Sequence, residues 1–287
     1  MKQKTVRFIV VHIPLIFVTI VTLVPFLLTF VVSFSDERSV LVNGYSFFPD
    51  SFSAYAYRYV LADDMIYRAY LVTICVTAVG TLLSVFLCAM AGYAMSVQKL
   101  RHRNKIAMYF YIPMVFQVSL VPWYLVVTNV LMLKNNLLAL VVPLLIVPFY
   151  IFLLRNYFST IPPSLAESAE IDGASQFQIF IRIIFPLGIP IIATVTLFVA
   201  LKYWNDWTMA LWFIDKREYQ PLQFMLFRIK SLIDYLQRSS SARTSRIVPT
   251  ETVQAATLFV TIGPIILMYP FVQKYFIKGI MIGAVKG

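Results

Sequence analysis

Charged side chains are scarce in this sequence of 287 residues. Asp, Glu, Lys and Arg together make up 13% of it, whereas soluble domains carry about 25%. Hydrophobic residues make up 60%, which is more apolar surface than a water-soluble domain of this size can bury. The composition therefore excludes a cytosolic enzyme, a secreted disulfide scaffold and a disordered chain. It predicts that lipid surrounds much of the protein.

Residues with the chemistry for metal binding or covalent catalysis are also scarce. The two cysteines, Cys75 and Cys88, lie within one apolar stretch, and the two histidines are His12 and His102. Neither pair has the spacing of a disulfide framework or a metal site. The sequence contains no G-x-x-x-x-G-K-[ST] phosphate-binding loop. We therefore predict a chain without catalytic residues, bound metal or enzymatic activity.

Long apolar runs dominate the sequence instead. A helix needs about 20 residues to cross roughly 30 Å of hydrocarbon, and six stretches are long enough. The first run is too long for the core of a signal peptide, and no small-residue cleavage site follows it. The sequence predicts an all-α, polytopic membrane protein that forms a single domain over residues 1–287. The six expected spans are 8–34, 70–96, 106–130, 137–157, 188–214 and 253–276.

The distribution of charge predicts how these spans are oriented. The N-terminal segment carries Lys2, Lys4 and Arg7 without an acidic residue, and residues 97–105 carry four basic residues and no acid. The segment between the first two spans is instead rich in Asp and Glu. Because basic loops mark the cytoplasmic side, we expect both termini in the cytoplasm of a plasma (inner) membrane protein. The net charge of +11 then mostly reflects topology, and no nucleic-acid partner is expected.

A cytoplasmic segment, 158–187, separates the fourth and fifth expected spans. Two consecutive prolines prevent the fourth span from continuing, because proline lacks a backbone donor. Ser164 is expected to cap a short helix, with Glu167 completing a capping box. Gly173 is expected to end that helix in the left-handed conformation.

A second helix is expected to follow, capped by Ser175 and ended by Pro186. Its apolar residues recur at steps of three and four, so that one face can lie against lipid or the helix bundle. These residues are Phe177, Phe180, Ile181 and Ile184. By its composition alone, the segment is either an interfacial connector or a surface that meets a basic partner.

Residues 167–173, Glu-Ser-Ala-Glu-Ile-Asp-Gly, resemble the EAA loop of permease subunits in binding-protein-dependent ABC importers. Over essentially its full length the chain is similar to the maltose-transporter-type sugar permeases. The tail, 269–287, and the Tyr-Trp-Asn-Asp-Trp run at 203–207 also match that group. The resemblance implies the ABC importer type I permease fold and a role in carbohydrate import.

The resemblance further implies that the short helix is a coupling helix, docked in a cleft of a cytoplasmic ATPase. Glu167 would pair with a basic group of the ATPase, Asp172 and Gly173 would shape the turn, and Ala169 and Ala174 would allow close packing. The partner ATPase, and not this chain, would bind ATP and Mg²⁺. The expected partners are two ATPase subunits, a second and different permease, an extracytoplasmic solute-binding protein and the lipid bilayer.

The external segment, 215–252, is basic overall and is expected to be a loop. By resemblance, it faces the binding protein. Our hypothesis is that Arg238, Arg243 and Arg246 favour an acidic oligosaccharide by charge attraction. The alternative is that a solvated loop contacts acidic patches on the binding protein.

Polar residues within the expected spans are candidates for the substrate pathway. We single out Gln117 in the third span, with Tyr203 and Asn205 near the outer end of the fifth. Lys202 and Asp206 are four positions apart and could form a helical ion pair. The alternative roles are interhelical hydrogen bonding and an interfacial aromatic belt.

These features favour a permease subunit of an ABC importer. The alternative function is a stand-alone secondary transporter or channel, which would need buried carboxylates along an ion path. The central portions of the six spans contain no Asp or Glu. That alternative would also leave the segment 158–187 without a role.

Overall fold

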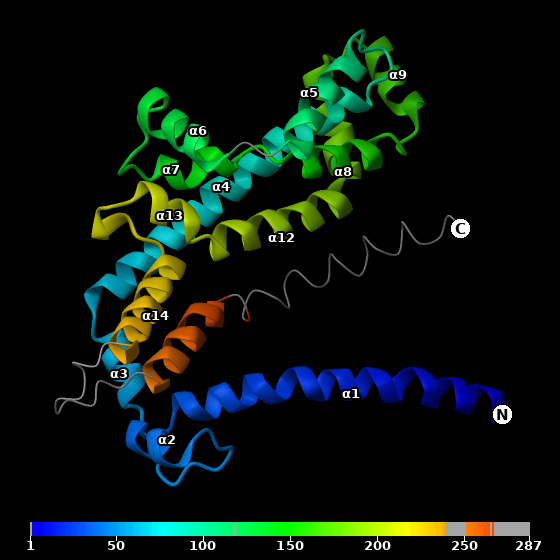
Figure 1. Cartoon of the computed structure of the whole chain (residues 1–287). Coiled ribbons are helices and arrows are strands. Elements are labelled where there is room, and N and C mark those ends of the chain that lie inside the picture. Colours follow the sequence, from blue (N-terminus) through cyan, green and yellow to red (C-terminus); the bar gives the residue numbers. More distant parts are fainter. Residues whose placement is uncertain (1, 117–118, 239–250, 265, 267–287) are drawn as a thin grey trace. The chain divides into compact units, whose positions relative to one another are not determined.

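A computed structural model describes residues 2–116, 119–238, 251–264 and 266 of the chain (Figure 1). The regular structure of these residues is helical, apart from one isolated bridge between Ser35 and Phe52. The prediction of an all-α fold is therefore confirmed. The chain divides into two compact units, of which the first comprises 1–66 with 225–264 and the second comprises 67–224 with 265–287.

Two helices are individually long and apolar enough to cross a membrane. They are residues 11–33 within α1 (Lys2–Ser33) and the whole of α4 (Asp64–Ser96). Three bent pairs of shorter helices also pass if each pair counts as one span, which gives up to five spans among the described residues. The sixth expected span begins within a helix at 251–264, and most of its remainder lies outside the described residues.

The third expected span consists of two helical pieces rather than one continuous helix. The pieces are α5 (Arg103–Val115) and α6 (Leu120–Leu125), the latter continued by the π-helical turn η1 (Val126–Val130). Residues 117–118, between them, lie outside the described part of the chain.

The fourth expected span is also broken. Its first piece is α7 (Leu138–Val141) with the 3-10 turn η2 (Val142–Leu144), and its second is α8 (Pro148–Phe158). The two pieces meet at 50°. Val147 lies at the break with an extended backbone (φ −117°, ψ 106°), because the ring of a following proline disfavours the helical conformation.

The fifth expected span differs from the prediction at both ends. The helical segment that leads into it comprises α10 (Gln176–Ile179), the π-helical turn η3 (Phe180–Ile184) and α11 (Phe185–Leu187). The prediction that Pro186 ends this segment is wrong, because Pro186 lies in the first turn of α11, where a missing backbone donor costs little. The break falls at Gly188 instead, and α12 (Ile189–Asn205) continues at 85°.

The C-terminal end of the fifth expected span stops at Asn205, nine residues before the predicted end at 214. Asp206 has an extended backbone, and its carboxylate accepts hydrogen bonds from the Thr208 hydroxyl at 2.7 Å and the Met209 amide at 3.1 Å. These bonds cap a separate short helix, α13 (Thr208–Phe213).

The prediction that the segment 215–252 is a loop is wrong for its first part, which is helical. It contains a short 3-10 turn, η4 (Arg217–Tyr219), and the helix α14 (Leu222–Arg238). Apolar residues recur in α14 at steps of three and four, which is the period of an amphipathic helix. At its start, the Leu222 amide donates to the Thr73 hydroxyl of α4 at 2.8 Å.

In the first unit, the aromatic end of α1 packs on the helix at 251–264. The Phe259 ring lies edge-on to the rings of Phe26 and Phe30, with centroid distances of 5.0 and 5.1 Å. Two short helices follow α1 in this unit, α2 (Glu37–Asn43) and α3 (Tyr55–Leu61).

A buried carboxylate fixes the start of the helix at 251–264. Glu37, which is 8% exposed, accepts hydrogen bonds from the amides of Glu251 and Thr252 and from the Thr252 hydroxyl, at 3.0, 2.9 and 2.6 Å. These amides belong to the first turn, where a helix lacks internal acceptors. The Tyr45 hydroxyl donates to the Glu251 carboxylate at 2.5 Å, and this bond raises the pKa of Tyr45 to about 12.

In the second unit, α4 and α12 approach closely at Gly80 of α4. A Cβ atom at Gly80 would lie 2.5 Å from the ring of Tyr203, so only glycine fits beneath that ring. The Tyr203 hydroxyl donates to the Val141 carbonyl of α7 at 2.9 Å. Tyr203 therefore ties α12 to both α4 and α7.

Candidate coupling helix and substrate pathway

The first helix expected in the segment 158–187 is α9 (Pro163–Ile171). The predicted capping box of Ser164 and Glu167 is wrong, because the helix begins two residues earlier and its N-cap residue, Pro162, makes no side-chain hydrogen bond. Pro163 occupies the first helical position, where its fixed φ suits the helix and its missing amide would be unbonded anyway. Proline therefore replaces the side-chain cap.

The end of α9 is a Schellman motif. Gly173 has φ +82°, its amide donates to the Glu170 carbonyl at 3.0 Å, and the Ala174 amide donates to the Ala169 carbonyl at 2.9 Å. The predicted left-handed stop at Gly173 is confirmed. The turn gathers Ala169, Asp172, Gly173 and Ala174, four of the five residues that the resemblance connects with the ATPase.

The second helix begins as predicted. The Ser175 hydroxyl accepts from the Gln178 amide at 3.3 Å, and the Gln178 side chain accepts from the Ser175 amide at 2.8 Å, which completes a capping box. Phe180 and Ile184 are buried, as expected for the inner face of the helix. Phe177 is 56% exposed.

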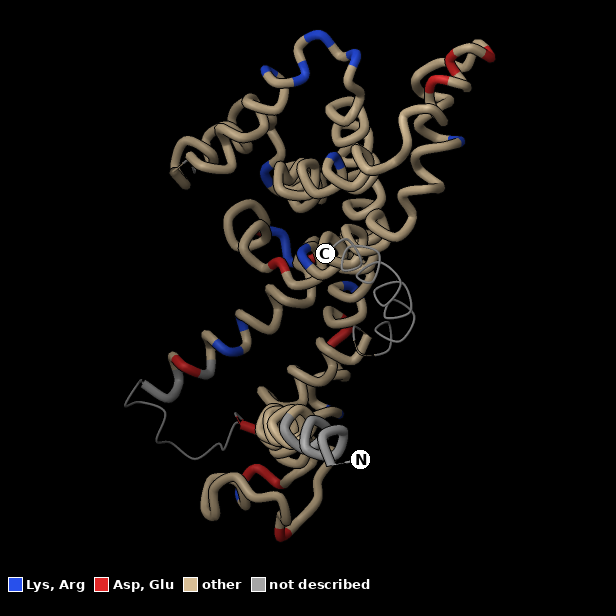
Figure 2. The backbone as a smooth tube through the Cα atoms, turned by 90° about the vertical axis from the view of Figure 1, so that its right-hand side faces the viewer, with Lys and Arg blue, Asp and Glu red and all other residues tan. Residues whose placement is uncertain are grey.

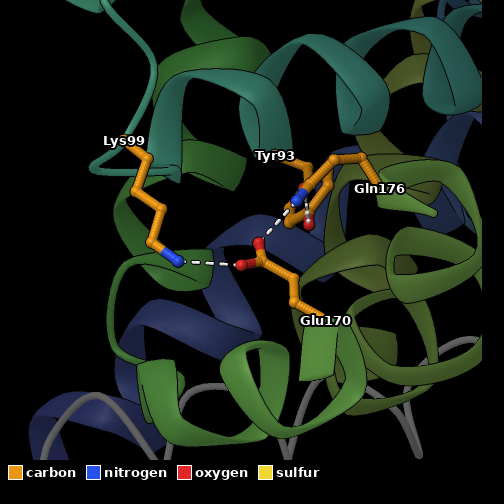
Figure 3. Close-up of polar contacts among 4 residues, drawn as sticks. All are labelled: Tyr93, Lys99, Glu170 and Gln176. Carbon is orange, nitrogen blue, oxygen red and sulfur yellow. Dashed lines mark hydrogen bonds and ion pairs between the residues drawn. The ribbon is translucent and has the colours of Figure 1, made fainter. Parts of the chain in front are cut away.

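A polar clamp holds the back of α9 (Figure 3). The Lys99 ammonium, in the turn between α4 and α5, lies 2.8 Å from the Glu170 carboxylate. The Gln176 amide donates to the other oxygen of Glu170 at 2.6 Å, and the Tyr93 hydroxyl of α4 donates to the Gln176 carbonyl oxygen at 2.8 Å. These four residues, Tyr93, Lys99, Glu170 and Gln176, form the Glu170 clamp.

The clamp shifts the ionisation of its charged members in opposite directions. The hydrogen bond from Lys99 lowers the pKa of Glu170, and the same bond raises the pKa of Lys99. Both groups are therefore charged over the whole physiological range. Sequence reasoning missed this clamp, because Lys99 and Glu170 are separated by 71 positions and no local pattern connects them.

Glu167 and Ile171 lie on the side of α9 next to Glu170, since one precedes it by three positions and the other follows it directly. Glu167 is exposed, and Ile171, one turn later, has an exposed fraction of 87%. Figure 2 shows acidic positions on this helix and basic positions on the turn between α4 and α5. Among the described residues, no Lys or Arg nitrogen lies within 4 Å of the Glu167 carboxylate. An exposed apolar side chain beside a carboxylate that has no ion pair is typical of a surface that a partner covers.

A cavity of about 430 Å³ lies behind α9. It contains the Glu170 clamp and the side chains of Arg103, Arg155 and Glu167. The cavity lies between α9 and the C-terminal ends of α4 and α8. The hydrogen bonds of the Glu170 clamp connect α9 to α4 and to the turn after α4. Among the described residues no group of three or more His, Cys, Asp and Glu side chains could hold a metal ion.

The candidate pathway residues are not gathered at one place. Gln117 lies outside the described residues. Tyr203 is only 3% exposed and serves the contacts with α4 and α7. Asn205 is exposed, and its side-chain oxygen accepts from the Gln223 amide at 3.2 Å.

The predicted ion pair between Lys202 and Asp206 is wrong. No ion pair within 4 Å joins them in the described structure. The Asp206 carboxylate faces the start of α13, where two hydrogen bonds hold it. Helical spacing alone could not reveal this, since α12 ends before Asp206.

The three arginines expected to face the binding protein are largely beyond the described part of the chain. Arg238 is the last residue of α14, while Arg243 and Arg246 lie outside the described residues. In the second unit, Asn135 organises the turn after α13, because its side-chain oxygen accepts from the amides of Asp215 and Lys216 at 2.6 and 3.2 Å.

Comparison with known proteins identifies the family to which this chain belongs. The family of binding-protein-dependent transport system inner membrane components matches residues 88–282. The polygalacturonan/rhamnogalacturonan transport system permease protein YtcP of Bacillus subtilis (strain 168) is 35% identical over 274 residues, which cover 95% of this chain and 96% of that protein. The trehalose/maltose transport system permease protein MalG of Thermococcus litoralis is 29% identical, with full coverage of both chains.

A solved structure agrees with these relatives. One chain in the crystal structure of a bacterial ABC transporter involved in the import of the acidic polysaccharide alginate superposes with a TM-score of 0.83 and 29% identity. The superposition covers 96% of this chain and 98% of that one. Since the family match covers well over half of the sequence, the chain belongs to the binding-protein-dependent ABC permeases of the maltose-transporter type, as a non-enzymatic, multi-pass inner-membrane subunit of a carbohydrate importer.

Proposed function

We propose that this chain forms half of the translocation pathway of an ABC importer for acidic oligosaccharides. The observation that carries the proposal is the construction of α9, which Lys99 clamps through Glu170 while Glu167 and Ile171, on the adjoining side of the helix, stay exposed. A helix held in this way can transmit a push from an ATPase to the end of α4. An exposed loop without the clamp would absorb the same movement.

The proposed topology has six spans with both termini in the cytoplasm, and a single domain over residues 1–287. The basic N-terminal segment and the basic turn at 97–105 support this orientation. The clamp also supports it, because it joins that basic turn to α9 and so requires both on one side of the membrane. The sixth span would be the helix at 251–264 together with residues up to 276.

In the proposed complex, α9 is the coupling helix. Glu167 pairs with a basic group of the ATPase, Ile171 fills an apolar depression beside it, and Asp172 and Gly173 shape the turn. Ala169 and Ala174 keep the back of that turn small. The complex contains two ATPase subunits, which bind ATP and Mg²⁺, together with a different companion permease and a solute-binding protein.

The proposed substrate class rests on two observations. The external segment carries Arg238, Arg243 and Arg246, and two of the similar proteins carry names that refer to polygalacturonan and to the acidic polysaccharide alginate. Basic side chains raise the local concentration of a carboxylate-bearing sugar. Uptake by the reconstituted complex of a uronate oligosaccharide, compared with a neutral one of equal length, tests this class. Equal uptake of the two would overturn it.

Affinity purification of the chain from its host in mild detergent tests the coupling assignment. We expect an ATPase and a second permease to accompany the wild-type chain, and the variant Ile171→Asp to lose the ATPase. Val42→Asp is the matched control, since Val42 is also an exposed apolar residue, at 76%, but lies in α2. If neither variant changes ATPase recovery, α9 is not the docking helix. Recovery of the chain without any ATPase would favour the alternative, a stand-alone secondary transporter or channel.

A further inference from the structure

One face of α12 carries three exposed side chains of complementary chemistry. Phe198, Lys202 and Asn205 follow one another at steps of four and three, so they lie along one face of the helix. All three are exposed in the isolated subunit, Phe198 with a fraction of 41%. The adjacent stripe, which includes Val199 and Tyr203, is buried against the rest of the second unit.

Lys202 is an unusual residue for this position. It lies one turn from the end of an otherwise apolar helix, and no carboxylate lies within 4 Å of it in the described structure. Asp206, the acid nearest in sequence, directs its oxygens to the start of α13. An ionisable residue in a membrane span faces a water-filled path or a partner rather than hydrocarbon. We therefore expect the Lys202 ammonium to be solvated by water or paired with an anion.

The neighbours of Lys202 on this face suit a sugar ring. The Phe198 ring stacks on the ring of Tyr150 from α8, with centroids 6.5 Å apart and an interplanar angle of 2°. The pair presents a flat apolar surface one helical turn before Lys202. The Asn205 side-chain oxygen accepts from the Gln223 amide at 3.2 Å, and its amide donates to the Leu201 carbonyl at 2.9 Å. Each of these two groups can form one further hydrogen bond.

We propose that Phe198, Lys202 and Asn205 form a carboxylate-selecting subsite of the translocation pathway. Lys202 pairs with the carboxylate of a uronic-acid unit, the aromatic surface of Phe198 packs against the ring, and Asn205 hydrogen-bonds a hydroxyl group. The three positions extend over about 10 Å of helix, which is enough for a carboxylate and its adjoining ring. This inference rests on the proposed import of acidic oligosaccharides and names the group that recognises the acid.

The test measures uptake of a uronate oligosaccharide and of a neutral oligosaccharide of equal length by the complete reconstituted importer. We expect Lys202→Gln to lower uptake of the uronate by about tenfold or more relative to the neutral sugar, the loss typical of one charge-assisted hydrogen bond. Lys202→Arg should retain the preference. Lys105→Gln is the matched control, because Lys105 is an exposed lysine of α5, outside this face and outside the external segment 215–252.

A chemical rescue separates charge from structure. In a chain with Cys75 and Cys88 replaced by alanine, Lys202→Cys should lose the preference for the uronate. Modification of that cysteine with a cationic aminoethyl thiosulfonate should restore the preference, and an anionic sulfonatoethyl reagent should not.

The outcomes distinguish this inference from the proposed function. If the wild-type importer does not prefer the uronate, the proposed substrate class fails. If it does prefer the uronate and Lys202→Gln keeps that preference, the subsite fails while the substrate class stands. Equal loss of both sugars, with no rescue by the cationic reagent, would assign Lys202 to packing or to the membrane surface and would also overturn the subsite.

Discussion

The carboxylate of Glu37 accepts hydrogen bonds from both the amide and the hydroxyl of Thr252, 215 positions later in the chain. It thereby supplies acceptors to the first turn of the helix at 251–264, which packs against the aromatic end of α1. The contact connects the segment after the first span with the start of the last one. It is a structural device of the first unit, whereas α9 belongs to the second.

Replacement of Glu37 by alanine should destabilise the first unit. The buried amides of Glu251 and Thr252 would lose their acceptor, at a cost of about 1–3 kcal/mol. Thermal unfolding of the purified complex in detergent measures the effect. Glu218→Ala is the control, because Glu218 is exposed and its removal should change stability by less than about 0.5 kcal/mol. An equal unfolding temperature for the two variants would contradict the assignment of Glu37 as a cap.

Replacement of Gly173 by alanine should impair coupling. The φ of +82° is unfavourable for a residue with a Cβ atom by about 1–2 kcal/mol, so the turn after α9 would rearrange. We expect the subunit to insert and assemble, with uptake reduced relative to ATP hydrolysis.

Gly44→Ala provides a matched control for this substitution. Gly44 has φ +76°, and, as at Gly173, a Cβ atom added there meets no neighbouring atom within 4 Å. The strain at Gly44 is at least as large, because its ψ of −170° gives a conformation that is essentially restricted to glycine, but it falls after α2. Loss of coupling in both variants would mean that general strain, and not the shape of the α9 turn, is responsible.

The contact between Lys99 and Glu170 should depend on pH in a predictable direction. Because Lys99 lowers the pKa of Glu170, the contact stabilises the clamp fully above the usual glutamate pKa of about 4.3. This stabilisation is lost as pH falls through the lowered value. Since the pKa of Lys99 is raised, the contribution of the lysine is present below about 10.4 and is lost as pH rises through the raised value.

Hydrogen exchange of the α9 amides as a function of pH, corrected for the intrinsic rate, measures clamp opening. Glu170→Gln should make α9 more open at neutral pH and should remove the acidic transition. The charge reversal Lys99→Glu combined with Glu170→Lys should restore protection in part. Unchanged protection in Glu170→Gln would show that the clamp does not hold α9.

A methyl group at Gly80 should disturb the packing of α4 on α12. A Cβ atom there would overlap the Tyr203 ring, and overpacking of this kind costs about 1–3 kcal/mol. Gly80→Ala should lower the unfolding temperature of the complex. Gly263→Ala is the matched control, because a Cβ atom at Gly263 meets nothing within 4 Å, and it should leave that temperature unchanged or raise it. A lower unfolding temperature for Gly263→Ala than for Gly80→Ala would contradict the close packing described for α4 and α12.

Local chemistry explains which features of the fold could be predicted. The left-handed stop at Gly173 and the cap at Ser175 depend on residues within a few positions of each other, and both are confirmed. The start of α9 was predicted two residues late, because a serine with glutamate three positions later matched a capping box although Pro163 was a better first residue. The capping-box pattern favoured a start after Ser164, whereas the fixed φ of proline favoured a start at Pro163, and the structure follows the proline.

Other features depend on contacts between distant residues. The clamp of Lys99 and Glu170, the cap that Glu37 provides and the contact of Gly80 with Tyr203 each join segments that no periodicity relates. Hydropathy located apolar stretches correctly but not the breaks within them. The end of α12, for example, depends on the hydrogen bonds of one carboxylate, that of Asp206.

The first unit is discontinuous in sequence, since residues 1–66 are grouped with residues 225–264 and most of the second unit lies between them in the chain. During synthesis, α1 leaves the ribosome long before Phe259 exists to pack against it. The apolar surface of α1, including Phe26 and Phe30, must therefore be sheltered by lipid or by the insertion machinery until nearly the whole chain has been translated. Termination before residue 225 would release a protein whose first helix never acquires its partner, which makes residues 225–264 a checkpoint in its biogenesis.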